Sequence, residues 1–179
     1  MKQQKNKYNN LEDFLSSPLL SHTILDIDLS ESLINEELVY DLGCALEKCS
    51  QLSSLELYLF NNCIGDKGTA YLGSSLEKCI NLQSLTLYLG NNLIGDEGAI
   101  NLGTSFEYCS NLQNLVLFIK WNEISADGAL QLVDSLSNCA NLQTLILDLQ
   151  GNYHAYRSQF KFRTRILKAQ RLVMKKIYA

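Results

Sequence analysis

The sequence is poor in several features that mark large classes of protein. It contains one proline, Pro18, and two histidines among 179 residues. No stretch approaches the about 18 to 20 unbroken apolar residues that a transmembrane helix requires. The first ten residues have no apolar core of the kind that a secretory signal needs. We therefore expect an intracellular, cytoplasmic protein that makes no membrane contact.

Motifs of common enzyme chemistry are also missing. The sequence has no GxSxG, HExxH or GxxxxGK[ST] motif and no regularly spaced acids of a calcium loop. His22 and His154 have no nucleophile in a recognisable motif beside them. Four of the six cysteines recur 30 residues apart, unlike the close pairs of zinc sites, so we expect reduced, buried thiols. The sequence predicts no enzyme activity, no metal and no cofactor.

An internal repeat of 30 residues is the dominant feature of the sequence. Apolar residues make up 46% of the chain, and many of them recur in columns without any gap. The columns are Leu52, Leu82, Leu112 and Leu142; Leu55, Leu85, Leu115 and Leu145; Leu57, Leu87, Leu117 and Leu147; Leu59, Leu89, Ile119 and Leu149; Asn62, Asn92, Asn122 and Asn152; Gly68, Gly98 and Gly128; and Cys49, Cys79, Cys109 and Cys139.

Each repeat predicts one strand followed by one helix. Alternating leucines at 55, 57 and 59 indicate a strand, and the i, i+3, i+4, i+7 spacing of apolar residues from Gly68 to Cys79 indicates an amphipathic helix. Asp66 and Asp96 stand where a helix N-cap is expected. The expected strands lie near residues 25–29, 55–59, 85–89, 115–119, 145–149 and 173–178.

The pattern LxxLxLxLxxNxIGDxG followed by a helix resembles the leucine-rich repeat, most closely its ribonuclease-inhibitor-like class. The resemblance covers residues 22–179, with a unit of 30 residues that has an extra Leu-x pair before the asparagine. It implies an α/β solenoid, a curved right-handed superhelix with a parallel sheet on the concave face and helices on the convex face. We expect about five repeats, a sixth terminal strand, and an N-terminal tail and cap over residues 1–21. In the last unit, His154, Ala155 and Ser158 replace the usual isoleucine and glycines, so its loop should differ.

Residues between the strand leucines should point out of the concave face, which is the usual binding face of such repeats. One outward column contains Tyr58, Tyr88 and Phe118 in succession, with an aspartate at either end. Exposed aromatic clusters are enriched at protein interfaces, although these rings could simply shield the sheet and touch each other. The predicted partner-binding residues are Asp28, Glu56, Tyr58, Phe60, Tyr88, Phe118, Trp121 and Asp148.

The charge is distributed very unevenly along the chain. The total is −4, but residues 8–150 carry 4 basic and 19 acidic groups, whereas residues 151–179 carry eight basic groups and no acid. This basic segment either caps the solenoid and protects an edge strand, or docks an acidic protein or RNA. The candidate docking residues are Arg157, Lys161, Arg163, Arg165, Lys168 and Arg171.

Three functions remain open at this point. The leading hypothesis is a protein–protein interaction module without enzyme activity, an adaptor or a subunit of a larger assembly. The alternative is a subunit that docks RNA or an anionic surface through residues 151–179. Analogy with the repeat family alone adds an inhibitor that covers an enzyme's active site. The sequence names neither the partner nor the oligomeric state.

Overall fold

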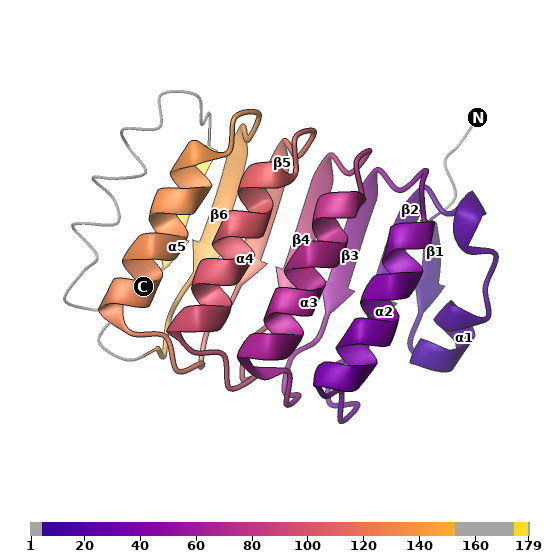
Figure 1. Cartoon of the computed structure of the whole chain (residues 1–179), viewed down its shortest axis with the longest axis horizontal. Coiled ribbons are helices and arrows are strands. Elements are labelled where there is room, and N and C mark those ends of the chain that lie inside the picture. The colour runs from indigo at the N-terminus through magenta and orange to yellow at the C-terminus, as the bar shows by residue number, and fades with distance from the viewer. Residues whose placement is uncertain (1–4, 153–173, 179) are drawn as a thin grey trace.

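The computed structural model describes residues 5–152 and 174–178, which form one parallel sheet with helices along one face (Figure 1). The strands lie in sequence order across the sheet. They are β1 (Lys5–Tyr8), β2 (Ile24–Asp28), β3 (Ser54–Tyr58), β4 (Ser84–Tyr88), β5 (Asn114–Phe118), β6 (Thr144–Asp148) and β7 (Met174–Tyr178). The helices are α1 (Leu11–Leu15), α2 (Glu36–Lys48), α3 (Gly65–Lys78), α4 (Asp96–Tyr108) and α5 (Ala126–Asn138), with a short 3₁₀ turn, η1 (Leu19–Ser21). This arrangement confirms the predicted α/β solenoid.

The 30-residue repeat of the sequence matches the register of the strands in the sheet. Each residue of β3 pairs with the residue 30 positions later in β4, so Leu55 lies beside Leu85 and Tyr58 beside Tyr88. The inward leucines of these strands are at most 1% exposed. Because one strand and one helix cannot bury their apolar faces alone, each repeat depends on its neighbours for a closed core. None of the described helices is long and apolar enough to cross a membrane.

The N-terminal segment contains a strand that the sequence pattern did not predict. Residues 5–8 pair in parallel with β2 and become the first strand of the sheet, and α1 follows directly. Leu11 and Phe14 of α1 are buried at this end of the core. The segment KNKY has no alternation of apolar and polar residues, and for that reason its pairing could not be read from its own sequence.

Asp66 and Asp96 do not cap their own helices, contrary to the expectation. The N-cap residues of α3 and α4 are Ile64 and Gly95, which leaves both aspartates within the first turn. The Asp66 carboxylate instead accepts hydrogen bonds from the Gly95 and Gly98 amides at 2.7 and 2.9 Å, at the start of the next helix. Asp96 accepts from the Ser125 amide and hydroxyl, both at 2.6 Å. Each aspartate therefore caps the following repeat.

The loop before α3 differs from its counterparts. Gly65 has φ +62°, whereas Gly95 and Ser125 at the equivalent positions are extended. The side-chain oxygens of Asn62 and Asn122 each accept two amides from the preceding repeat's loop. The Asn92 Oδ1 atom is buried and has no hydrogen-bond partner in the described part of the chain. The amides that would donate to the Asn92 side chain belong to the altered loop before α3. The different backbone of that loop accounts for the missing hydrogen bonds.

Neighbouring helices pack closely because a glycine in one faces a serine in the next. A Cβ atom at Gly43 would lie 2.3 Å from Ser75 Oγ, and one at Gly73 would lie 2.6 Å from Ser105 Oγ. Glycine inside a helix costs about 1 kcal/mol relative to alanine, so its presence here needs a packing reason. The close approach of α2, α3 and α4 supplies that reason.

Candidate functional site

Three aromatic rings form a continuous stack on the outer face of the sheet, the face away from the helices. The Tyr58 and Tyr88 rings lie 4.4 Å apart between centroids and 8° from parallel. The Tyr88 and Phe118 rings lie 4.8 Å apart and 18° from parallel. These spacings match the distance between neighbouring strands, so the sheet register itself creates the stack. All three residues are partly exposed.

Phe60 and Trp121 form a second aromatic pair just beyond the carboxyl ends of the strands. Their ring centroids lie 6.1 Å apart in an edge-to-face arrangement, although they belong to repeats that are not adjacent. Between them stands Gly90, where an added Cβ would lie 3.1 Å from the Phe60 ring. The missing side chain at position 90 therefore allows the two rings to meet across a whole repeat.

Trp121 combines high exposure with an uncommon backbone conformation. Its side chain is 52% exposed and its φ angle is +55°. Asn61 and Asn91 occupy the same left-handed position in the two preceding repeats, and asparagine tolerates that region far better than a bulky residue. A Cβ at Gly151 would lie 2.0 Å from the Trp121 ring, so the next repeat leaves space for it. The Lys120 amine lies 4.3 Å from the ring centroid.

The N-terminal end of the outer face is acidic and partly neutralised by the chain itself. The Lys5 amine lies 3.0 Å from both Asp26 and Glu56, and the Lys7 amine lies 2.8 Å from Asp26. Burial by itself raises the pKa of the Asp26 carboxyl, but hydrogen bonds from Lys7 and Lys5 outweigh it and hold that pKa below its ordinary value. Burial, followed by the nearby Glu56 charge, raises the pKa of Tyr58 to about 12, so its hydroxyl stays protonated and donates to Glu56 at 3.2 Å.

One predicted contact residue, Asp148, is buried instead of exposed. Its exposed fraction is 8%, whereas Asp28 at the opposite end of the same column is exposed. In the sheet register Asp148 lies between Phe118 and Tyr178. One of its oxygens accepts the Gln150 amide at 3.0 Å. Asp148 is therefore poorly placed to contact a partner directly.

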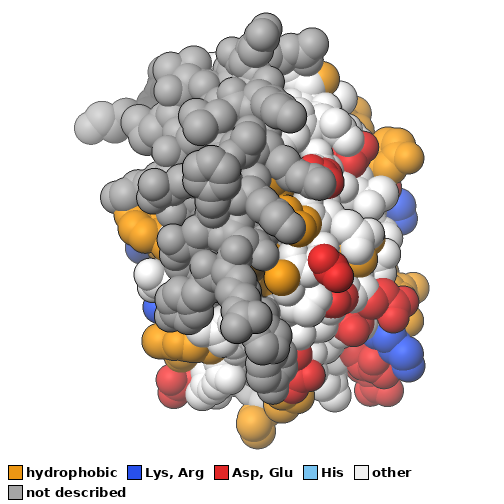
Figure 2. Space-filling model, turned by 90° about the vertical axis from the view of Figure 1, so that its left-hand side faces the viewer, with side chains coloured by type: hydrophobic (Ala, Val, Ile, Leu, Met, Phe, Trp, Pro, Cys, Tyr) orange, Lys and Arg blue, Asp and Glu red, His pale blue; other side chains and the backbone are white. Residues whose placement is uncertain are grey.

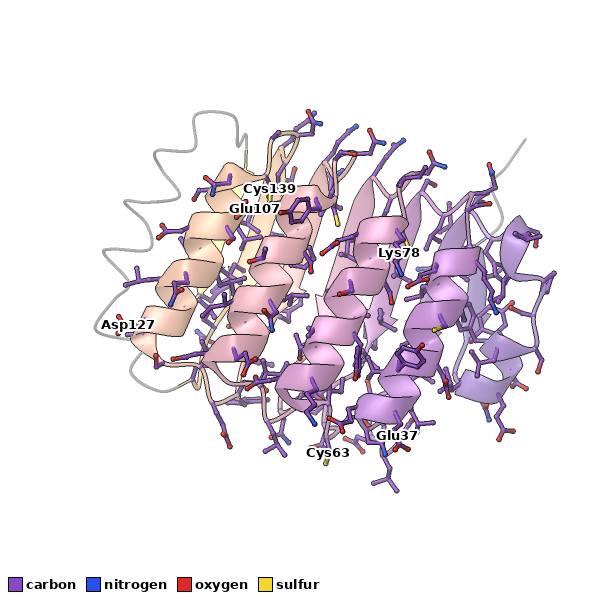
Figure 3. The ribbon with its side chains drawn as sticks, viewed as in Figure 1. Glu37, Cys63, Lys78, Glu107, Asp127 and Cys139 are labelled. Carbon is purple, nitrogen blue, oxygen red and sulfur yellow. The ribbon has the colours of Figure 1, made fainter. Side chains whose placement is uncertain are left out.

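The cysteine column lies at the end of the helices away from the aromatic pair. Burial raises the pKa of the Cys49 thiol to about 11 and the pKa values of Cys79, Cys109 and Cys139 to about 12. Thiols with such pKa values are poor nucleophiles and poor metal ligands at neutral pH. Figure 3 shows Cys139 at the end of α5, far from the N-terminal end of that helix marked by Asp127. Within residues 5–152 and 174–178, no three potential ligands group around a metal position.

The basic docking residues predicted from the sequence, Arg157 to Arg171, lie outside the described residues. The described part of the chain is acidic instead. In Figure 2 acidic side chains gather at the lower right of the view, with few basic ones among them.

Four residues near the aromatic surface were missed by sequence reasoning. Lys5 and Lys7 reach the acidic end only because β1 joins the sheet. Lys120 was not predicted because it lies after the end of β5, directly behind the buried Ile119. Glu31 is exposed at a left-handed turn, and its amide donates to the Phe60 carbonyl at 2.9 Å. Glu31 shares its repeat position with Trp121, so the 30-residue period alone was a signal that could have identified it.

Comparison with known proteins gives a fold and no close relative. No protein-family model matches the sequence, and no curated protein matches it significantly. Among solved structures, one similar to this chain is Leiomodin-1 Actin-Binding Site 2. It has 16% identity and a TM-score of 0.61, with 90% of this chain and 89% of that chain covered. Another is internalin C2 from Listeria monocytogenes, with 21% identity, a TM-score of 0.46, and 90% of this chain but only 65% of that chain covered. The strand order and the first of these likenesses identify the fold of this chain as that of a leucine-rich-repeat solenoid.

Proposed function

We propose that the chain is a protein–protein interaction module without enzyme activity, which binds a protein partner through the outer face of its sheet. Its role is that of an adaptor or a subunit of a larger assembly inside the cell. The fold supports this because solenoids of this kind offer an extended surface for another protein. The similar leiomodin structure is itself described as an actin-binding site.

The observation that carries the proposal is the exposed Trp121 in a left-handed backbone conformation. Residues held in sparsely populated backbone regions cost stability and cluster at functional sites. Folding does not need a tryptophan here, because Asn61 and Asn91 serve the same turn in neighbouring repeats. Trp and Tyr are also the residues that dominate binding hot spots. Trp121, Phe60 and the three-ring stack together provide such a surface.

A pair of variants tests this proposal by affinity capture and mass spectrometry. Trp121→Asn restores the residue found at positions 61 and 91, so we expect unchanged or higher thermal stability and loss of the captured partner. The double variant Tyr88→Ala with Phe118→Ala should also lose the partner, with little change in thermal stability. Tyr108→Ala is the matched control, since Tyr108 is 67% exposed on α4, on the helix side. Partner capture that survives both aromatic variants would move the binding site elsewhere.

A further inference from the structure

The aromatic stack ends at β3, where no other ring of the described residues covers one face of Tyr58. Tyr88 covers one face of Tyr58 at 4.4 Å with nearly parallel planes. Since the stack runs across the strands, the other face of Tyr58 points toward β2. The residue in register there is Asp28, whose side chain is short and exposed. The space above Asp28 is therefore bounded by an aromatic face on one side and a carboxylate below.

Asp28 is a carboxylate on this edge for which the described residues provide no cationic partner. Its neighbours Asp26 and Glu56 are paired with Lys5 and Lys7. One Asp28 oxygen accepts the Ser30 amide at 3.1 Å. Among the described residues no basic side chain lies within ion-pair distance of Asp28. The ion pairs of Lys5 and Lys7 show that the surrounding acidic surface already binds cationic groups.

The other end of the aromatic surface, at Trp121, disfavours a cation of the partner. Lys120 lies over the Trp121 ring and supplies a positive charge there. A partner cation would be repelled at Trp121 and attracted at Tyr58, where Asp28 and the exposed Glu31 supply negative charge. The charge pattern thus gives the surface a direction, from acidic at β2 to basic beyond β5.

We propose that an arginine side chain of the protein partner stacks on the free face of Tyr58 and pairs with Asp28. This inference rests on the proposed function and names the chemistry of the partner at one point of the surface. The planar guanidinium fits because it stacks on an aromatic face and donates a fork of hydrogen bonds to a carboxylate at the same time. A lysine ammonium can satisfy the charge but cannot stack in this way.

The test is an NMR titration of the whole isotope-labelled chain with three small probes. The probes are N-acetyl-arginine amide, N-acetyl-lysine amide and the neutral isostere N-acetyl-citrulline amide. We expect the arginine probe to shift the amide signals of Asp28, Ser30 and Tyr58, the lysine probe to bind more weakly, and the citrulline probe to leave these signals in place. Asp28→Asn and Tyr58→Leu should each weaken arginine binding about two- to fivefold, as expected of an exposed ion pair or cation–π contact. The control Asp127→Asn removes an exposed carboxylate on α5 and should change nothing at these signals.

Equal shifts from the arginine and lysine probes, or binding that Asp28→Asn leaves intact, would overturn the arginine site. Absence of shifts at the three amides would do the same. These outcomes are distinct from failure of the proposed function, because partner capture that depends on Trp121 is measured separately. If the titration fails while Trp121→Asn still abolishes capture, the interaction module stands and only the arginine contact is wrong.

Discussion

At the scale of single residues, Asp66 and Asp96 stabilise the repeat that follows their own. The sequence identified both as helix-start acids but assigned them to the wrong helix. The sequence pattern shows only how far a residue lies from the start of its own helix. Stacking of the repeats brings the amides at the start of the next helix within 3 Å of the Asp66 carboxylate. Ala126 of α5 stands at the equivalent position, so this series of caps ends with Asp96.

We predict that Asp96→Ala lowers the free energy of unfolding by about 1 kcal/mol, within the range of about 0.5 to 2 kcal/mol seen for lost helix caps. The variant removes the two acceptors of the Ser125 amide and hydroxyl. Urea unfolding followed by circular dichroism gives the measurement. Asp127→Ala is the control, because Asp127 is an exposed acid in the first turn of α5. Equal losses in both variants would mean that only the helix dipole is involved.

His22 is the second residue whose position implies a measurable effect. Its side chain is 1% exposed, and its ring nitrogens bond to Asn6 at 2.7 Å, Ser17 at 2.8 Å and Tyr8 at 3.2 Å. It therefore links β1 and the segment after α1 to the first repeat. Burial lowers the pKa of this histidine, so the folded state favours the neutral ring.

We predict that stability is highest above the unfolded histidine pKa of about 6.5 and falls as the pH drops below it. The sign follows because the unfolded chain takes up a proton on this histidine before the folded chain does. Thermal unfolding at a series of pH values from 8 to 5 should show a progressive loss. The variant His22→Gln keeps hydrogen-bonding capacity without the titration and should flatten this part of the profile. An unchanged slope in that variant would assign the effect to other groups.

At the scale of elements, the column of glycines at positions 43, 73 and 103 determines how closely the helices pack. We predict that Gly73→Ala destabilises the protein by about 1 to 3 kcal/mol, the usual cost of overpacking, despite the better helix propensity of alanine. The new Cβ would lie 2.6 Å from Ser105 Oγ and 3.0 Å from Ser105 Cβ. Ser74→Ala, an exposed position in the same helix, should be neutral or stabilising in the same denaturation assay. A stable Gly73→Ala variant would show that α3 and α4 can separate without cost.

The elements also show where prediction from sequence succeeds and where it ends. Strands β2 to β6 each lie one residue upstream of the expected range. They could be located this closely because alternating leucines give a clear period of two. β1 was missed because Lys5–Tyr8 has no such period and forms only by pairing with β2. The Tyr58, Tyr88 and Phe118 column could be read directly from the period. The Phe60–Trp121 contact could not, because it depends on the absent side chain at Gly90.

At the scale of the whole molecule, the charge separates two modes of binding. Residues 8–150 carry a formal net charge of −15, whereas residues 151–179 carry +8. A partner held by the aromatic surface would be bound mainly by apolar contacts and by few ion pairs. A nucleic acid or another polyanion held by residues 151–179 would be bound mainly by charge. The two modes therefore differ in their dependence on salt.

We predict that the affinity for the captured protein partner changes less than about tenfold between 50 and 200 mM salt, whereas six to ten phosphate contacts would lose about 10³- to 10⁵-fold. Calorimetry or fluorescence anisotropy at several salt concentrations gives the slope. The triple variant Arg163→Gln, Arg165→Gln and Lys168→Gln should leave both affinity and slope unchanged, and Trp121→Asn should abolish binding at every salt concentration. A steep slope that the triple variant flattens would instead favour docking through the basic segment. In that case the aromatic surface would serve only to shield the sheet, and its left-handed tryptophan would need another explanation.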